Sequence, residues 1–208
     1  MKVKVCGMKH PDNIENLSLL PVDYMGFIFY PKSLRYVGEL SPKLIHSSTT
    51  HMMKVGVFVN ENQENLFNIV EKYDLNAIQL HGNETQMYCK NIVKNFPKIN
   101  VIKAFSILGV NDLNLTKEYE EFCDFFLFDT KSQQYGGTGK KFDWSILNSY
   151  KGEKRFFLSG GISIEDVEKI KEIQHPKLYG LDINSNFEIE PGRKDIELVK
   201  QFIQQIKL

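Results

Sequence analysis

Cys6 and Asp129 are two side chains of this sequence that could divide proton transfer between them. Cys6 ends a strand-like run at 2–6, and Asp129 follows four apolar residues at 125–128, which would disfavour its ionised form. A thiolate can remove a proton from a substrate and a carboxylic acid can donate one, provided that the protein supplies a suitable environment for each. The alternatives are a cysteine that is a small buried apolar residue and an aspartate that caps a helix.

A glycine pair indicates a binding site for a phosphate group. Gly160 and Gly161 follow the strand-like run at 155–159 and precede a helical pattern. Glycine lets the backbone approach an anion closely, and the N–H groups at a helix start point toward it. Asn184 and Ser185, which follow the last strand-like run, could complete the cradle. The alternative is a tight turn for which glycine is needed only by the backbone.

The segment 130–142 is rich in glycine and lies between two strand-like runs. It is not a Walker A loop, because Gln134 and Lys141 stand where that motif requires a glycine and a hydroxyl residue. We interpret it as a flexible lid that closes over a substrate, with a disordered loop as the alternative.

Eight strand-like runs recur along the chain and could position these residues. They end at polar or glycine-containing corners and occupy 2–6, 24–30, 53–59, 76–80, 100–105, 124–129, 155–159 and 178–183. Amphipathic helices are expected at 64–73 and 165–173, with helix starts signalled by capping patterns at 60–63, 83–86 and 163–166.

The repetition of these runs predicts the fold. Eight units in 208 residues give about 26 residues per unit, close to the shortest length that holds a strand, a helix and two turns. We therefore predict an α/β fold, a minimal (β/α)8 TIM barrel formed by one domain over residues 1–208. An open doubly wound sheet is the alternative, but no GxGxxG follows the first strand. In a barrel the chemistry occurs at the carboxyl ends of the strands, where the candidate residues stand.

The composition excludes several classes of protein. Lys plus Arg and Asp plus Glu number 26 each, so the formal net charge is zero, unlike that of proteins that bind nucleic acid or a membrane surface through excess basic charge. The three cysteines form no disulfide framework and no CxxC pair, and we expect no metal site. The N-terminus lacks a signal-peptide pattern, and no apolar stretch is long enough to span a membrane. We therefore expect a cytoplasmic protein with no nucleic-acid or membrane partner.

Seven segments of the chain, all in the same order, carry a family resemblance. They are KVCGMKHPDN at 4–13, GFIFYPKSLRYV at 26–37, VGVFVNE at 55–61, QLHGNE at 79–84, FDTKSQQYGGTGKKFDW at 128–144, LSGGI at 158–162 and LDINSNFEIEPGRKD at 181–195. Through them the chain resembles the phosphoribosylanthranilate isomerase family over essentially its whole length. The resemblance implies an Amadori rearrangement of N-(5-phosphoribosyl)anthranilate to the 1-deoxyribulose isomer in tryptophan biosynthesis, with no metal and no organic cofactor. It also implies a small phosphorylated substrate, and we expect a monomer or a homodimer.

The resemblance also implies roles for individual residues. Asp129 would be the general acid that protonates the furanose ring oxygen, and Cys6 the general base that removes the proton from C2′. Arg35 matches the arginine that holds the anthranilate carboxylate, for which a planar guanidinium is suited; a solvated surface arginine is the alternative. His81 and Asp182 match substrate-binding positions, although each could instead cap a helix or bond to nearby backbone.

The phosphate-binding positions implied by the resemblance are Gly160, Gly161, Asn184 and Ser185. The sequence departs from the family's pattern at Asn186, where a glycine usually follows the serine. Asparagine tolerates left-handed backbone angles better than other non-glycine residues, so we expect the loop to keep its shape.

Two other functions are compatible with the residues. Lys103 lies in the apolar run at 101–105, and a lysine buried in a barrel could act as the nucleophile of a Schiff-base aldolase. An outward-facing lysine between strand and helix is the alternative. A non-catalytic barrel that binds a phosphorylated ligand is the other function.

Overall fold

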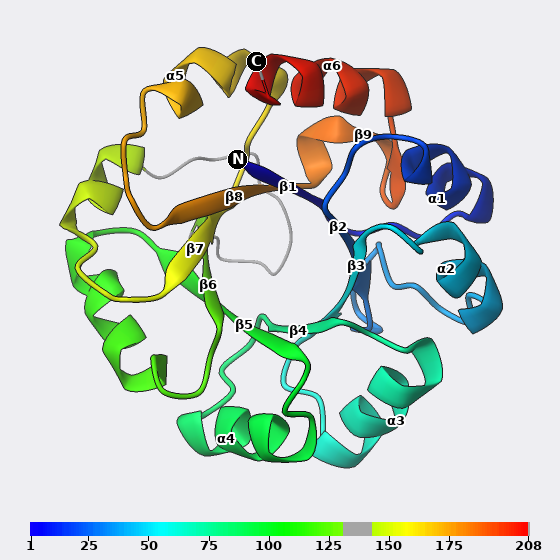
Figure 1. The fold of residues 1–208 in the computed structure, drawn as a ribbon, viewed down its shortest axis with the longest axis horizontal. Helices are drawn as coiled ribbons and strands as arrows, with labels where there is room; N and C mark the ends of the chain where they lie inside the picture. The colour runs from blue at the N-terminus through cyan, green and yellow to red at the C-terminus, as the bar shows by residue number, and fades with distance from the viewer. Residues whose placement is uncertain (131–142, 208) are drawn as a thin grey trace.

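Eight parallel strands close into a barrel because the first strand pairs with the last. The computed structural model describes residues 1–130 and 143–207. Each strand pairs with the next in sequence order, and β1 with β8 completes the circle (Figure 1). The strands are β1 (Lys2–Val5), β2 (Tyr24–Ile28), β3 (Met53–Phe58), β4 (Ala77–Leu80), β5 (Asn100–Ile107), β6 (Phe125–Thr130), β7 (Arg155–Leu158) and β8 (Leu178–Ile183). The predicted (β/α)8 barrel is confirmed, and the open doubly wound sheet is wrong.

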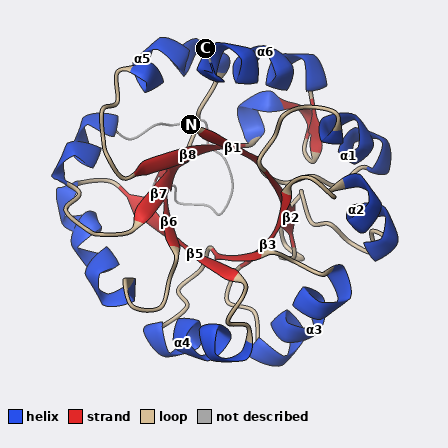
Figure 2. Ribbon diagram, in the orientation of Figure 1, coloured by secondary structure: helices blue, strands red, loops and turns tan. Residues whose placement is uncertain are grey.

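A ring of helices surrounds the barrel (Figure 2). The α-helices are α1 (Pro11–Ser18), α2 (Pro42–Ser48), α3 (Gln63–Tyr73), α4 (Gln86–Asn95), α5 (Val167–Lys171) and α6 (Ile196–Lys207). Short 3₁₀ helices are η1 (Val110–Tyr119), η2 (Trp144–Ser149), η3 (Ile164–Asp166) and η4 (Ser185–Phe187). The chain thus forms 3₁₀ helices after β5 and before β7, where the βα alternation predicts α-helices. The Asn, Asp and Thr residues of η1 explain this difference there, because their side chains compete for backbone hydrogen bonds.

Two of the predicted helix starts are wrong by two residues. Helix α3 is capped by Asn62 and helix α4 by Thr85, whose side chains accept hydrogen bonds from the helix backbone. Asn60 instead adopts a left-handed backbone with φ of 50°. Its side-chain oxygen accepts a hydrogen bond of 2.7 Å from the N–H of Asn83. The two asparagines therefore join the loops after β3 and β4 rather than starting the helices.

Apolar side chains fill the amino-terminal half of the barrel interior. The buried members of this cluster, which come from six strands, are Tyr24, Val55, Ala77, Ile102, Ala104, Leu127 and Phe157. At the same end the hydroxyl groups of Tyr24 and Tyr179 share a hydrogen bond of 2.9 Å. Because this half of the interior is packed, a substrate site is left to the carboxyl ends of the strands.

The described elements belong to the barrel and its ring of helices, apart from a small hairpin of β9 (Glu188–Glu190) and β10 (Arg193–Lys194) after β8. One domain over residues 1–208 stays a prediction. Across 1–130 and 143–207, none of the helices combines the length and the apolar character needed to cross a membrane. The segment 131–142, which contains most of the predicted lid, lies outside the described residues.

Candidate active site

One cavity at the carboxyl ends of the strands is lined by every residue that the sequence analysis named for the site. Those residues are Cys6, Arg35, His81, Asp129, Gly160, Gly161, Asp182, Asn184 and Ser185. Gln79 and Ser159 also line it, and the sequence analysis gave neither of them a role. The closed barrel thus gathers groups from both ends of the chain around one space.

The Cys6 thiol is buried in the cavity wall beside an ammonium group. Cys6 is 4 % exposed, and burial raises the pKa of its thiol because a thiolate loses its hydration there. The ammonium group of Lys4 acts in the opposite direction and lowers this pKa. Gly26 on β2 leaves room for both groups, since a methyl group on its Cα would lie 2.8 Å from Cys6 Sγ and 3.2 Å from Lys4 Nζ. The cation therefore lies where it favours the thiolate form of Cys6.

Lys4 is fully buried and forms an ion pair with Asp182. Its Nζ donates a hydrogen bond of 2.7 Å to Asp182 Oδ1, and Asp182 Oδ2 accepts another of 3.2 Å from Ser159 Oγ. Burial lowers the pKa of Lys4, but Asp182 and Cys6 more than offset it, so the pKa is raised and the side chain stays charged. The sequence analysis missed Lys4. Its spacing of two from Cys6, which puts both side chains on one face of the extended chain, could have indicated it.

Asp129 is the second-last residue of β6, and its side chain lies against that of His81, which follows β4. The two side chains are partly exposed to the cavity, and His81 Nε2 is 3.3 Å from Asp129 Oδ2. The other ring nitrogen, Nδ1, is 2.8 Å from Nε2 of Gln79. His81 thus connects a buried amide to the candidate acid, and within the described residues its ring caps no helix and bonds to no backbone group.

The glycine pair forms a left-handed turn that suits an anion. Gly160 and Gly161 have φ angles of 91° and 70°, so both lie in the region that favours glycine. Both glycines line the cavity, and because they have no Cβ their backbone can approach an anion closely. The helical segment begins with η3 at Ile164, directly after Ser163, where the capping pattern predicts a helix start. Its predicted capping is confirmed, since the N–H and Oγ of Ser163 donate to Asp166 at 2.7 and 2.8 Å.

Asn186 ties the loop after β8 to this glycine turn. Its Nδ2 donates hydrogen bonds of 2.8 Å to the carbonyl of Gly161 and 3.3 Å to that of Ile162. Asn186 lies within η4 and is not among the residues with positive φ. The expectation that it uses a left-handed conformation is therefore wrong. The loop keeps its shape through a side-chain anchor that glycine could not supply.

Arg35 is held at the cavity by Glu188, at the start of β9. The guanidinium donates to both carboxylate oxygens of Glu188 at 2.7 to 3.0 Å. The arginine side chain is 13 % exposed, so the alternative of a solvated surface arginine is wrong. The sequence analysis missed Glu188, because its partner lies on a loop 153 residues away.

A second cation, Lys194, shares the carboxylate of Glu188. Lys194 Nζ donates to Glu188 Oε1 and to Asn184 Oδ1, each at 2.6 Å. Burial opposes ionisation of Glu188, but Arg35 and Lys194 outweigh it and hold its pKa below the ordinary value. Burial lowers the pKa of Lys194 to about 8, although Glu188 opposes the change. Two cations around one carboxylate give this wall of the cavity a net positive charge at neutral pH, which favours an anionic ligand.

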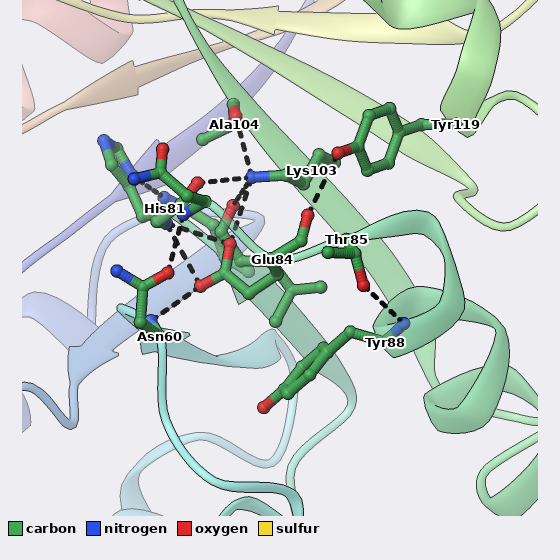
Figure 3. A network of polar contacts seen from close by, with 12 residues as sticks. Asn60, His81, Glu84, Thr85, Tyr88, Lys103, Ala104 and Tyr119 are labelled. Carbon is green, nitrogen blue, oxygen red and sulfur yellow. Dashed lines mark hydrogen bonds and ion pairs between the residues drawn. The ribbon is translucent and has the colours of Figure 1, made fainter.

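Lys103 lies outside the cavity, on the side of β5 that faces the helices. Its neighbours Ile102 and Ala104 pack inside the barrel, whereas Lys103 Nζ lies 6.0 Å from the ring centre of Tyr119 in η1. The ammonium donates to Glu84 at 3.0 Å and to three backbone carbonyls at 2.8 to 3.3 Å (Figure 3). The outward-facing alternative is confirmed, and the aldolase hypothesis loses its nucleophile.

Comparison with known proteins agrees with this arrangement. Residues 3–205 match the family described as N-(5'phosphoribosyl)anthranilate (PRA) isomerase. The chain is 47% identical to N-(5'-phosphoribosyl)anthranilate isomerase of Parabacteroides distasonis, over 99% of this chain and 93% of that protein. The crystal structure of phosphoribosyl anthranilate isomerase from Thermotoga maritima is similar, with a TM-score of 0.85, 36% identity and coverage of 100% and 98%.

A further solved structure of a phosphoribosyl anthranilate isomerase holds reduced 1-(o-carboxyphenylamino)-1-deoxyribulose 5-phosphate. It is similar to this chain with a TM-score of 0.82, 32% identity and coverage of 100% of this chain and 98% of that one. The match of the family over nearly the whole chain, the identity to its members and the shared barrel lead to one conclusion. The chain belongs to the N-(5'-phosphoribosyl)anthranilate isomerase family.

Proposed function

We propose that this chain catalyses the isomerisation of N-(5'-phosphoribosyl)anthranilate in tryptophan biosynthesis, by general acid–base catalysis without a metal or organic cofactor. The observation that carries the proposal is that Cys6 and Asp129, from strands on opposite sides of the barrel, line one cavity together with the glycine turn after β7. An aldose–ketose rearrangement needs one proton donated and another removed, and these are the groups suited to the two tasks.

The reaction begins with proton donation by Asp129. The carboxylic acid protonates the furanose ring oxygen, the bond between that oxygen and C1′ breaks, and a Schiff base forms with the anilinic nitrogen. Cys6, as the thiolate, then takes the proton from C2′, and the resulting enolamine tautomerises to the ketone. Lys4 supports the second step because its buried charge favours the thiolate.

Separate parts of the cavity hold the two anionic groups of the substrate. Backbone N–H groups at Gly160 and Gly161 receive the phosphate, and Asn184 and Ser185 complete its site from the loop after β8. Arg35 holds the anthranilate carboxylate, and Glu188 orients the planar guanidinium group of Arg35. Because the formal net charge of the chain is zero, these local groups must supply the attraction.

His81 and Asp182 complete the substrate site in this proposal. His81 lines the cavity in contact with Asp129, and Asp182 presents a buried carboxylate beside Ser159. We also propose that the protein acts in the cytoplasm, where its three free cysteines would remain reduced. A binding barrel without catalysis is the remaining competitor.

The test combines complementation with an assay of the purified enzyme. The wild-type gene should restore growth of a tryptophan auxotroph that lacks the isomerase, and the enzyme should consume phosphoribosylanthranilate, followed by its fluorescence. Cys6→Ser and Asp129→Asn should each lower kcat by about 100-fold or more while KM changes little. Unaltered turnover by Asp129→Asn would overturn the assignment of the acid. A wild-type protein that binds phosphoribosylanthranilate without consuming it would support a binding barrel.

A further inference from the structure

Gln79 is a buried residue of the cavity wall whose amide is only partly satisfied. It is 1 % exposed, it lies on β4 two residues before His81, and its Nε2 is 2.8 Å from His81 Nδ1. Its Oε1 is buried and has no hydrogen-bond partner in the part of the chain that the structure describes. An unpaired buried acceptor costs about 1–3 kcal/mol, so a glutamine with a purely structural role would gain by pairing both ends.

The contact with Gln79 determines which nitrogen of His81 carries a proton. An amide NH₂ group only donates, so the nitrogen that faces it, Nδ1, must accept and can carry no proton. A neutral imidazole then has its proton on Nε2, which is the nitrogen 3.3 Å from Asp129 Oδ2. The imidazolium form is disfavoured, because it would place an N–H donor against the donor of Gln79.

The backbone that carries His81 is fixed independently of this contact. The N–H of His81 donates to the carbonyl of Phe58 at 2.8 Å. The next residue, Gly82, donates its N–H to the carboxylate of Glu84 at 3.0 Å, and Lys103 pairs with the same carboxylate (Figure 3). A rigid corner holds the ring at its Cα, and the amide of Gln79 then determines the ring's hydrogen-bonding state.

We propose that Gln79 is a positioning residue that keeps His81 neutral, with its proton on Nε2 facing the carboxyl group of Asp129. The inference rests on the proposed function, in which Asp129 must be protonated before it can act as an acid. A cationic His81 would stabilise the aspartate anion and make it a poorer proton donor. A neutral ring avoids this effect, and its N–H still stabilises the carboxylate once the proton has been transferred.

The other charged groups that the structure describes near this site do not impose the cationic form. Glu84 and Lys103 neutralise each other behind the corner at 3.0 Å. Across the cavity Asp182 is paired with Lys4, and Arg35 with Glu188. Within residues 1–130 and 143–207, Asp129 is the charged group in direct contact with the ring, and the Gln79 amide opposes the transfer of a second proton onto His81.

The first measurement is nitrogen NMR of the wild-type enzyme labelled at histidine, with His81 assigned by its loss in His81→Gln. Between about pH 6 and 8, His81 should be neutral with protonated Nε2 and unprotonated Nδ1. A proton on Nδ1, or an imidazolium over this range, would overturn the proposal. This readout needs no substrate, so it remains decisive even if the enzyme fails to isomerise phosphoribosylanthranilate, which would overturn the proposed function alone.

The second measurement uses Gln79→Glu, which replaces the donor by an acceptor, and Gln79→Met, which removes it. Gln79→Glu should keep His81 as the imidazolium to higher pH and lower kcat about tenfold or more, while KM stays within about threefold. The kcat should recover in part as the pH falls, because Asp129 then regains its proton. Gln79→Met should populate both tautomers with a smaller loss of rate. The exposed Gln204 gives the control, since Gln204→Glu adds the same charge away from the site. Wild-type NMR signals and pH profiles in both Gln79 variants would refute the role.

Discussion

The ammonium nitrogen of Lys4 lies 2.7 Å from a carboxylate oxygen of Asp182, and the strand register sets the two residues directly opposite each other where β1 meets β8. Both side chains are buried, and Cys6 follows two residues after Lys4 on the same face of the chain. A buried ion pair therefore stands beside the proposed base. One member of the pair favours the thiolate and the other opposes it.

Lys4→Met should slow the enzyme and destabilise it. Without the Lys4 cation, burial and Asp182 still raise the pKa of the Cys6 thiol, and only the weaker effect of Lys194 still lowers it. The kcat at neutral pH should therefore fall about tenfold or more, and the acidic limb of the rate profile should move to higher pH. The unfolding free energy should fall by about 3–5 kcal/mol, because Asp182 is left as an uncompensated buried charge. Urea denaturation and the ultraviolet absorbance of the thiolate measure the two effects.

The double variant Lys4→Met with Asp182→Asn separates charge from stability. Removing both charges should recover most of the lost stability, while the enzyme stays slow at neutral pH. Wild-type thiolate absorbance across the titration in Lys4→Met would show that the ammonium has no influence on Cys6.

Gly26→Ala should disturb the base directly. The added methyl group would lie 2.8 Å from Cys6 Sγ, 3.1 Å from Cys6 Cα and 3.2 Å from Lys4 Nζ. We expect a stability loss of about 1–3 kcal/mol and a lower kcat, because these groups must move apart to admit it. Gly109→Ala is the matched control, since its added carbon meets nothing within 4 Å and its φ is −150°. Equal melting temperatures and rates for the two variants would contradict this prediction.

Asn186→Gly should weaken substrate binding more than it slows chemistry. It removes the hydrogen bond of 2.8 Å to the carbonyl of Gly161 and adds backbone freedom to the loop after β8. KM should rise about threefold to tenfold with little change in kcat, because the contact acts equally on the ground state and the transition state. Asn186→Asp should raise KM further by adding a negative charge near the phosphate site. A loss confined to kcat would point to a role in the chemical step instead.

Lys194 should make the stability of the protein rise with pH in the alkaline range. Its pKa is lowered to about 8 in the folded protein by burial, whereas an unfolded lysine titrates near 10.4. Between these values the unfolded chain binds more protons, so the free energy of unfolding increases with pH there, and the penalty is fully present below about pH 8.

The comparison with Lys194→Met isolates this effect. From about pH 7 to 10, the difference in unfolding free energy should shift in favour of the wild type by about 1–3 kcal/mol. A shift in the opposite direction would mean that Glu188 outweighs burial and raises the pKa of Lys194.

The barrel and most of the cavity lining could be predicted from the sequence because they depend on local patterns. Each strand is recognisable as a short run of β-branched and aromatic residues. The corner after each run lies at the carboxyl end of a strand, and in a barrel these ends are all on one face. Cys6, Asp129 and Gly160 could therefore be located at one end of the barrel without any distance information. Their roles in catalysis and binding stay predictions until the variants are measured.

The partners of these residues could not be predicted, because each depends on a distant part of the chain. Lys4 reads as a solvated lysine until Asp182, 178 residues later, is placed beside it. Glu188 likewise reads as a solvated carboxylate until Arg35, 153 residues earlier, is placed beside it. Gln79 differs: its neighbour His81 is two residues away, but which nitrogen faces which group is a matter of side-chain geometry that residue types leave undetermined.

The closure of β1 onto β8 also bears on when activity can arise during synthesis. Cys6 is synthesised before Asp182, Asn184 and Lys194, which stand much later in the sequence. Until β8 is made, Lys4 lacks the carboxylate of Asp182, and the proposed phosphate site lacks Asn184 and Ser185. We therefore expect a nascent barrel that lacks β8 to be inactive, and the site to be completed only when β8 pairs with β1.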